Sequence, residues 1–225
     1  MAIDRNTNSA EETRDFRIDL GCGNRKVKGT YGVDNVAVPG VDVVADLDSG
    51  LPFRDGSIDG VYAYHILEHV DNFLETMNEI WRVCKDGALV HVKVPHSAST
   101  YVTWKDPTHR RGLSIATFAY FDDTYFDGAA FAYYATARFR IEHAQLNFNL
   151  SGRDENVKLS WPRRLMGAIV HRLANRNRRW QYFCERFWGP IVGIEEAVLT
   201  MRAQKKPRPS TIPTASPDEI AALKR

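Results

Sequence analysis

Short apolar segments alternate with amphipathic ones along this chain, and the alternation predicts its secondary structure. Apolar residues at 3-4 spacing predict a helix over Asp71–Val83, and the basic stretch Pro162–Phe187 is predicted to be helical as well. Strands that alternate with helices indicate a parallel-rich α/β sheet with crossover connections. Seven segments rich in β-branched or alternating apolar residues are predicted as strands: Phe16–Leu20, Tyr31–Val33, Val41–Ala45, Gly60–Tyr64, Ala88–Val94, Arg138–Leu150 and Ile194–Ala203.

Local signals add two expectations about the helices. The helix over 71–83 is predicted to stop at Lys85-Asp86-Gly87, where a cation is followed by glycine. About ten residues separate Gly23 from Asp34, fewer than a parallel crossover normally needs, so the first crossover helix is predicted to be abbreviated.

The polar ends of the chain divide it into three parts. Residues 1–15 lack periodicity and are predicted to be a flexible arm, followed by one domain over 16–204. That domain is expected to contain a helical insertion at about 151–190. The proline-rich residues 205–225 are predicted to be a flexible tail, with a short helix starting near Ser216-Pro217-Asp218-Glu219.

Composition narrows the class of protein. With 225 residues, 44% hydrophobic and 26% charged, the chain is not a collagen, a coiled coil or a wholly disordered protein. No apolar stretch approaches the roughly 18 residues of a membrane span, and the start of the chain is polar, so a cytoplasmic protein is expected. Three widely spaced cysteines without a CxxC pair argue against a disulfide framework or a zinc knuckle.

Candidate chemistry begins where the first predicted strand ends, in Asp19-Leu20-Gly21-Cys22-Gly23. Parallel sheets bind small molecules at the carboxyl ends of their strands, and glycine lets backbone approach a ligand closely. A dinucleotide motif would need a third glycine at position 26, where Lys26 stands instead. The carboxylate of Asp19 suits a ligand with an amino group and would repel a pyrophosphate.

The next two predicted strands also end in acids. Asp34 ends Gly32-Val33-Asp34 and can accept both hydroxyls of a ribose, whereas Asp46 is placed to accept a proton from an adenine amine. Amine, ribose and adenine contacts together describe a nucleoside that carries an amino acid, S-adenosylmethionine.

These motifs resemble the class I S-adenosylmethionine-dependent methyltransferases of the type-11 kind, over about residues 16–100. The resemblance implies a Rossmann-like, seven-stranded, mostly parallel sheet with flanking helices, plus a helical acceptor-side insertion. The matching segments are IDLGCGN (18–24), GVD (32–34), ADL (45–47), LPFRDGSIDGVYAYHILEHV (51–70) and NEIWRVCKDGALVHVKVPH (78–96).

The resemblance also assigns cofactor contacts. It implies that the glycine-rich segment holds the methionine end, that the acid after the second strand holds the ribose, and that the next acid holds the adenine. His65 would lie at the cofactor floor. The full set of cofactor-binding candidates is Asp19, Gly21, Cys22, Gly23, Asp34, Asn35, Asp46, Leu47 and His65.

A hydroxyl acceptor would need a base or a metal, because alcohols are poor nucleophiles at neutral pH. His96, Asp106 and His109 supply imidazole and carboxylate groups in the loop expected over the cofactor's methyl, and His143 is a fourth candidate. Mg²⁺ is the metal considered, because an aspartate can ligate a hard cation. The segment His65-Ile66-Leu67-Glu68-His69 is predicted to begin a helix, and its histidines, like His91, are interpreted as structural.

The second half of the chain offers two surfaces. Twelve aromatic residues lie in 101–148; most are expected in the core and some around an acceptor pocket. Residues 151–186 hold nine basic and three acidic residues, a local charge of +6. A solvated helix face, an anionic acceptor, RNA or a lipid surface would each explain it. The apolar residues of this stretch are predicted to pack on the domain or on a second subunit, with the arginines outward, which makes a homodimer one alternative.

These patterns favour methyl transfer to a hydroxyl of a small molecule or glycan, with a bacterial sugar O-methyltransferase foremost. The segments VPH (94–96) and DPTHRR (106–111), followed by an aromatic 118–121, resemble a bacterial type-11 subgroup that often occurs with glycan and natural-product biosynthesis. The alternative is a nucleic-acid methyltransferase that uses the basic 151–186 face, disfavoured because Tyr62-Ala63-Tyr64-His65 replaces the usual base-methylation motif. A non-catalytic subunit or another nucleotide-binding α/β protein would explain the retained acids less well.

Overall fold

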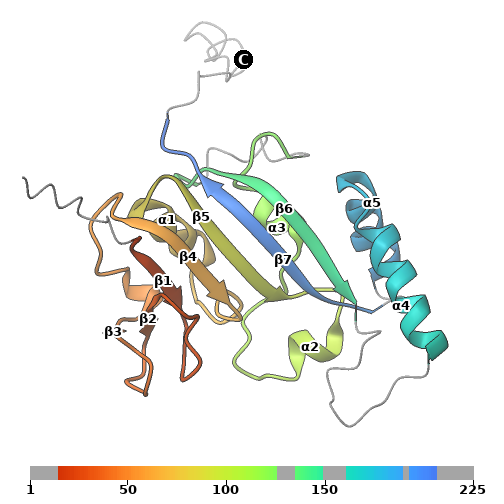
Figure 1. The fold of residues 1–225 in the computed structure, drawn as a ribbon, viewed down its shortest axis with the longest axis horizontal. Helices are drawn as coiled ribbons and strands as arrows, with labels where there is room; N and C mark the ends of the chain where they lie inside the picture. Colours follow the sequence, from red (N-terminus) through yellow and green to blue (C-terminus); the bar gives the residue numbers. More distant parts are fainter. Residues whose placement is uncertain (1–14, 126–134, 149–160, 190–192, 207–225) are drawn as a thin grey trace, which may run out of the picture.

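The computed structural model describes residues 15–125, 135–148, 161–189 and 193–206, and all statements below concern these residues. Its seven strands form one sheet in the order β3-β2-β1-β4-β5-β7-β6 (Figure 1). The predicted arm before residue 15, most of the predicted tail and the helix near Ser216 lie outside the described residues. The strands are β1 (Arg17–Leu20), β2 (Tyr31–Asp34), β3 (Val43–Val44), β4 (Ile58–Tyr64), β5 (Cys84–Pro95), β6 (Phe139–Phe148) and β7 (Ile194–Ala203).

The strand directions confirm the predicted mostly parallel sheet. β1 to β5 run parallel to one another, with Ile18 paired to Val61 and Leu20 to Ala63 between β1 and β4. β7 is inserted antiparallel between β5 and β6. The carboxyl ends of β1, β2, β3 and β4 therefore meet at one edge, which is where a parallel sheet binds ligands.

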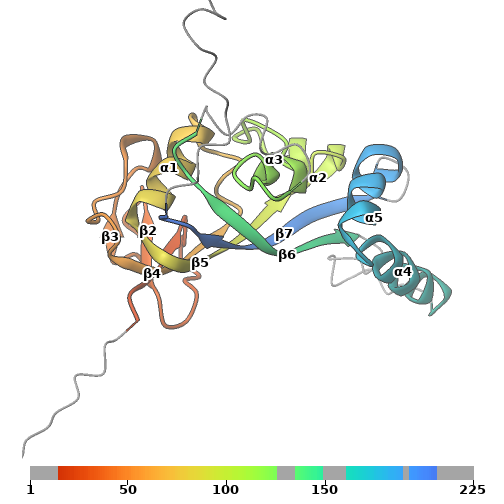
Figure 2. The same cartoon turned by 90° about the horizontal axis from the view of Figure 1, so that it is seen from above.

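The helices gather on one side of the sheet and beyond its β6 edge. Figure 2 shows α1, α2 and α3 above the strands, while α4 and α5 lie next to β6. The helical elements are η1 (Leu47–Ser49), α1 (Phe73–Val83), α2 (Thr100–Trp104), α3 (Ile115–Ala119), α4 (Trp161–Ala174), α5 (Arg178–Phe183) and the π-helical segment Cys184–Trp188.

The core forms between α1, α3 and the covered face of the sheet. Met77, Ile80 and Val83 of α1 are fully buried, because their spacing places them on one stripe of the helix that faces the strands. Asn72 caps the start of this helix by accepting from the Glu75 amide. Phe118 and Phe121 are also buried there, which confirms that aromatics of the 101–148 stretch belong to the core.

The structure corrects one predicted helix start and one predicted stop signal, and it confirms a further expectation. His65–Val70 forms turns instead of a helix, since β4 continues to Tyr64 and α1 begins only at Phe73. α1 ends at Val83 as predicted, but β5 starts directly at Cys84, so Lys85-Asp86-Gly87 is strand and does not cap the helix. No helix lies between β1 and β2, where all residues are described, as the short connection predicted.

The exposed face of α4 excludes one of the two predicted packing partners. The large apolar side chains of this stretch, predicted to pack on the domain or on a second subunit, do not pack on the domain: Leu165 is 54% and Ile169 47% exposed, and the small Gly167 and Ala174 face the protein instead. α4 and α5 follow β6 and precede β7, and their place on the acceptor side stays a prediction. None of the helices in the described ranges has the length and apolar character that crossing a lipid bilayer requires.

Candidate active site

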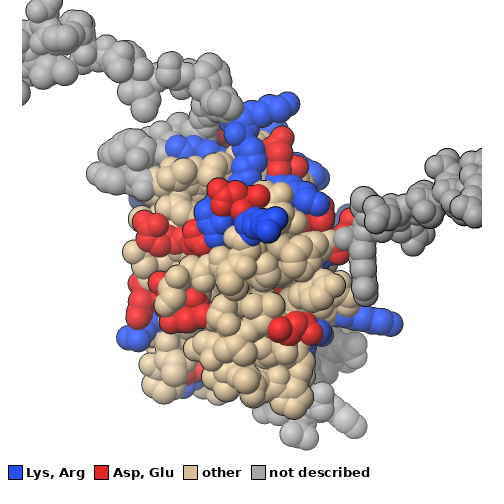
Figure 3. All heavy atoms as spheres, turned by 90° about the vertical axis from the view of Figure 1, so that its left-hand side faces the viewer, with Lys and Arg blue, Asp and Glu red and all other residues tan. Residues whose placement is uncertain are grey.

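Five of the predicted cofactor residues line one cavity at the carboxyl ends of the strands. This side of the molecule carries several acidic side chains (Figure 3). The loop after β4 closes the cavity, because Ile66, His69 and Val70 line it together with the residues that follow β1, β2 and β3. The lining residues that were predicted to bind the cofactor are Gly21, Asp34, Asn35, Asp46 and Leu47.

Local hydrogen bonds orient the two cavity acids. Asp34 Oδ2 accepts from the Gly23 amide at 2.9 Å, and its Oδ1 accepts from the Val36 amide at 3.2 Å. Asp46 caps η1 by accepting from the Asp48 amide at 3.0 Å. A carboxylate offers about four lone-pair sites, so both acids keep capacity for ligand hydroxyl or amine groups.

Gly21 allows the loops after β1 and β4 to meet. Its φ of +65° lies in the left-handed region, and a Cβ atom there would lie 2.6 Å from Ile66 Cδ1. Glycine at this position is therefore required by the packing of Ile66 against the β1 turn, whatever ligand the turn holds.

The remaining predicted cofactor residues of this turn do not line the described cavity. Asp19 is buried at the end of β1 and accepts from the Val27 amide at 2.8 Å, so it holds the loop that replaces the first crossover helix. Burial raises the pKa of Asp19, and the Val27 hydrogen bond opposes that rise. Cys22 is buried, and burial raises the pKa of its thiol. Their cofactor roles, like that of Gly23, stay predictions.

His65 turns toward a buried glutamate on β7. It has a φ of 56°, and its Nε2 lies 3.1 Å from Glu196 Oε1, while Lys93 Nζ lies 3.6 Å from the other carboxylate oxygen. Burial opposes protonation of His65, but the nearby carboxylates of Glu196 and Glu68 outweigh it and raise its pKa. The cofactor-floor role predicted for His65 is untested, and the cavity is lined by its neighbour Ile66 instead.

A second cluster joins the cavity to the loop after α2. One ligand-capable atom each of Glu68, His69 and His109 lies within 4.8 Å of the others. His109 Nδ1 lies 2.5 Å from the Thr103 carbonyl oxygen, and its Nε2 lies 3.9 Å from Glu68 Oε1 and 4.0 Å from Asp106 Oδ2. His69 lines the cavity and also belongs to this cluster, so the structure places the predicted Asp106 and His109 next to a residue of the cavity.

Comparisons with known proteins agree with this fold. A putative sarcosine dimethylglycine methyltransferase from Galdieria sulphuraria aligns with a TM-score of 0.51 and 12% identity, over 86% of this chain and 80% of that one. A SAM-dependent methyltransferase from Archaeoglobus fulgidus aligns with a TM-score of 0.48 and 19% identity, over 83% and 86%. A comparison with curated protein sequences found no match.

The sequence of the chain is also similar to a known domain family. Residues 18–92 match a methyltransferase domain. The match covers the strands whose ends form the cavity, β1 to β4, and most of β5. With the seven-stranded fold, it supports a class I S-adenosylmethionine-dependent methyltransferase.

Two predicted catalytic histidines lie apart from the cavity. His96 is 1% exposed, its Nδ1 accepts from the Ala98 amide at 3.1 Å, and its Nε2 therefore donates to Glu185 Oε1 at 2.9 Å. With both ring nitrogens engaged, His96 has no lone pair for an acceptor proton. His143 is exposed on β6, which β5 and β7 separate from β4, so the geometry argues against it too.

Sequence reasoning missed three buried carboxylates that lie beside the histidines. Glu68, Glu185 and Glu196 are each almost fully buried, and each faces a histidine. The segment His65-Ile66-Leu67-Glu68-His69 contained a signal, because it places a glutamate close to two histidines directly after a strand. Glu185 and Glu196 carried no such signal, since their partners are far away in sequence.

Proposed function

We propose that this protein transfers a methyl group from S-adenosylmethionine to a hydroxyl of a small molecule or glycan, with a sugar as the foremost acceptor. One observation carries the proposal: His69 lines the cavity that holds the predicted cofactor acids and also belongs to the cluster with His109. A group able to handle an acceptor proton thus adjoins the cofactor cavity.

The cavity residues fit the three parts of the cofactor. Asp34 would accept the ribose hydroxyls, and Asp46 with Leu47 would face the adenine, since all three line the same cavity. The methionine end would lie over the β1 turn, where Gly21 and Gly23 have positive φ and present backbone without Cβ atoms.

His109 is in the tautomer that methyl transfer to oxygen needs. When bound, the cofactor supplies a methyl group whose bond to sulfur breaks as an acceptor oxygen takes it, and the hydroxyl proton must go to a base. The Nδ1–H of His109 donates to the Thr103 carbonyl, so the lone pair is on Nε2, which faces the Glu68 side of the cluster. His109 would accept the proton there, and Asp106 would stabilise the resulting cation.

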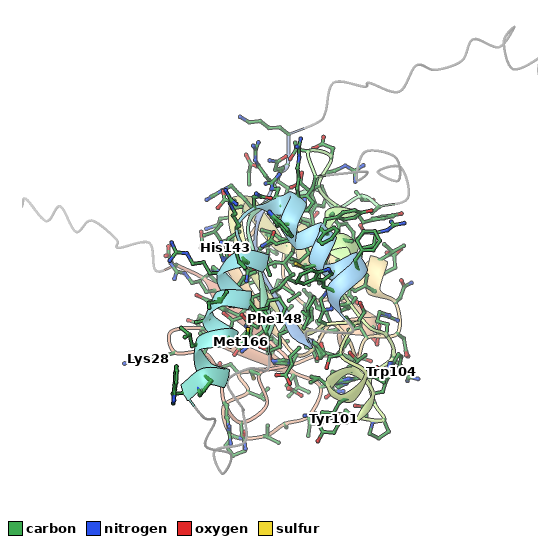
Figure 4. All side chains as sticks on the ribbon, turned by 90° about the vertical axis from the view of Figure 1, so that its right-hand side faces the viewer. Lys28, Tyr101, Trp104, His143, Phe148 and Met166 are labelled. Atoms are coloured by element: carbon green, nitrogen blue, oxygen red, sulfur yellow. The ribbon has the colours of Figure 1, made fainter. Side chains whose placement is uncertain are left out.

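Exposed aromatic rings beside the cluster favour a sugar or an aromatic acceptor. Tyr101 is 74% and Trp104 56% exposed on α2, which directly precedes the loop with Asp106 and His109. Both residues are labelled in Figure 4. Flat apolar faces with polar edges suit the faces of sugar rings.

A nucleic-acid acceptor is the alternative. Arg172, Arg176 and Arg179 are exposed in the described part of the basic stretch, and phosphates would bind such a surface. RNA binding that weakens steeply with salt would favour this alternative.

A labelled-methyl screen tests the proposal. The protein would be incubated with S-adenosylmethionine that carries a radiolabelled methyl group and with sets of sugars, phenols, amines and RNA. Label in a sugar or phenol as an alkali-stable ether supports the proposal. Label only in amines or RNA contradicts it, and a His109→Gln variant with unchanged turnover would contradict the assigned base.

A further inference from the structure

We infer that Glu68, His69 and His109 form a binding site for a divalent transition metal, of which Zn²⁺ is the probe we select. The inference rests on the proposed function only for the role of the metal, because binding itself needs no cofactor. It differs from the Mg²⁺ that the sequence suggested, both in the ligands and in the class of metal.

The first argument is the state of the Glu68 side chain. It is 1% exposed, and neither of its carboxylate oxygens accepts a hydrogen bond from any residue that the structure describes. His65 Nδ1 lies 3.6 Å and His109 Nε2 3.9 Å from Oε1, beyond hydrogen-bonding distance. A buried carboxylate without hydrogen bonds is costly unless a cation balances it.

The second argument is the orientation of the two histidines. The Thr108 hydroxyl donates its hydrogen to Asp106 Oδ1 at 2.6 Å. The hydroxyl oxygen, Thr108 Oγ1, also lies 2.9 Å from the Nδ1 of His69, so in this second contact Nδ1 must be the donor. The Nδ1–H of His109 donates to the Thr103 carbonyl. Both histidines thus have their lone pairs on Nε2, and metal-binding histidines are typically held by such a hydrogen bond from the other ring nitrogen.

The spacing and the ligand types decide the class of metal. Zinc–ligand bonds are about 2.1 Å, so two ligands of one ion lie at most about 4.2 Å apart. The 3.9 Å between His109 and Glu68 meets this limit, and the 4.8 Å bound on the whole cluster requires only a small side-chain rotation. Two imidazoles with one carboxylate suit zinc or another transition metal, whereas Mg²⁺ prefers oxygen ligands throughout.

Three protein ligands would leave coordination positions open toward the cofactor cavity, which His69 lines. An acceptor hydroxyl bound there would lose its proton more readily, because a metal lowers the pKa of a bound oxygen. Two open positions would suit an acceptor with adjacent hydroxyls, such as a sugar diol. In this arrangement the Nε2 of His109 binds the metal in place of acting as the base, and the proton leaves to solvent.

Calorimetry on the chelator-treated full-length protein, without S-adenosylmethionine, tests the site. One Zn²⁺ should bind per chain, with no comparable heat from Mg²⁺. Glu68→Gln, which keeps the side-chain shape, should weaken Zn²⁺ at least tenfold, and Thr108→Val about 10- to 100-fold by releasing His69. His143→Ala removes an exposed histidine outside the cluster and should change the affinity less than twofold.

The outcomes separate the two proposals. Absence of Zn²⁺ binding to the wild-type protein, or equal affinity in a folded Glu68→Gln variant, overturns the metal site. Zinc binding without binding of S-adenosylmethionine leaves the metal site intact and overturns the proposed function. Chelator-insensitive methyl transfer by a protein that binds Zn²⁺ overturns the catalytic role given to the metal.

A separate observation carries a second proposal: we infer that the outer face of α4 and α5 binds an anionic lipid surface. Figure 4 views this face, with Met166 labelled on α4. We call it the α4–α5 face. Its large apolar side chains are between 37% and 76% exposed: Trp161, Leu165, Met166, Ile169, Leu173, Trp180, Phe183, Phe187 and Trp188.

The positive charge of the α4–α5 face favours an anionic lipid surface over a second copy of the chain as the binding partner. Residues 161–189 contain seven arginines and one acid, Glu185, a formal charge of +6. The Glu185 side chain is only 9% exposed and binds His96, so it does not neutralise the face. Two such faces would repel each other, whereas basic helices with tryptophan and leucine on the apolar side lie in anionic membrane interfaces. RNA would leave the apolar side chains uncovered.

Vesicle sedimentation tests this second proposal. The protein should pellet with phosphatidylcholine vesicles that contain a quarter phosphatidylglycerol and far less with phosphatidylcholine alone. Leu165→Asp with Ile169→Asp should abolish the binding, whereas Val44→Asp, at an exposed apolar residue on β3, should not. No binding to anionic vesicles, or a stable dimer in solution that the double variant dissociates, overturns the proposal.

Discussion

The imidazole of His96 donates from Nε2 to Glu185 Oε1 at 2.9 Å, which ties the end of β5 to the π-helical segment before β7. The same glutamate oxygen accepts from the Ile115 amide at 2.7 Å, at the start of α3. One buried carboxylate thus connects three elements behind the candidate site. This arrangement makes His96 a structural residue, although its place after β5 predicted a catalytic one.

Glu185→Ala should destabilise the fold. Removing the carboxylate leaves the buried His96 ring and the Ile115 amide without acceptors, which should cost about 2–4 kcal/mol of unfolding free energy. Urea unfolding measures this loss. Glu185→Gln keeps one acceptor oxygen and should lose less. Equal stability of the alanine variant and wild type would contradict the assigned role.

Gly21→Ala should disturb the site more than the same change at Gly23. Both residues have positive φ, but a Cβ at Gly21 would overlap Ile66, whereas nothing lies within 4 Å of one at Gly23. We expect about 2–4 kcal/mol of destabilisation at Gly21 and about 1 kcal/mol at Gly23. Adding Ile66→Ala should recover part of the Gly21→Ala loss in a double-mutant cycle. Additive effects would show that Ile66 is not the obstacle.

The free energy of unfolding should decrease in acid, in part because the Glu79 carboxylate becomes protonated. Its carboxylate binds Arg82 at 2.8 Å through each oxygen and accepts from the Leu51 amide, and the Arg82 hydrogen bonds lower the pKa of Glu79. The contribution is therefore complete above the pKa of about 4.3 in the unfolded chain and is lost as pH falls through the lower value in the fold. Urea unfolding between pH 6 and pH 3 should show a flatter decline for Glu79→Gln. An equally steep decline would refute this assignment.

The strand pattern predicted the sheet well because β-branched alternation is a local property. Asp34, Asp46 and Gly21 line one cavity because the ends of parallel strands meet at one edge regardless of the details of their connections. Glu185 and Glu196 were missed because their partners, His96 and His65, lie 89 and 131 residues away in sequence. The spacing of apolar residues along the chain carries no information about such long-range contacts between side chains.

The packing partner of α4 could not be chosen from the sequence for a related reason. Helical spacing showed that its apolar residues share one face, but it did not show which face meets the sheet. The small Gly167 and Ala174 allow α4 to approach β6, which turns Leu165 and Ile169 outward.

Calorimetric titration with S-adenosylmethionine tests the central claim most directly, on the wild-type protein and on Asp34→Asn. We predict one binding site per chain, at least tenfold weaker in Asp34→Asn, because the amide would leave a ribose hydroxyl with a poorer acceptor. Asp59→Asn, at the opposite end of the sheet beside Lys85, should bind as wild type does. Absence of binding to the wild-type protein, or equal affinity in Asp34→Asn, would contradict the account.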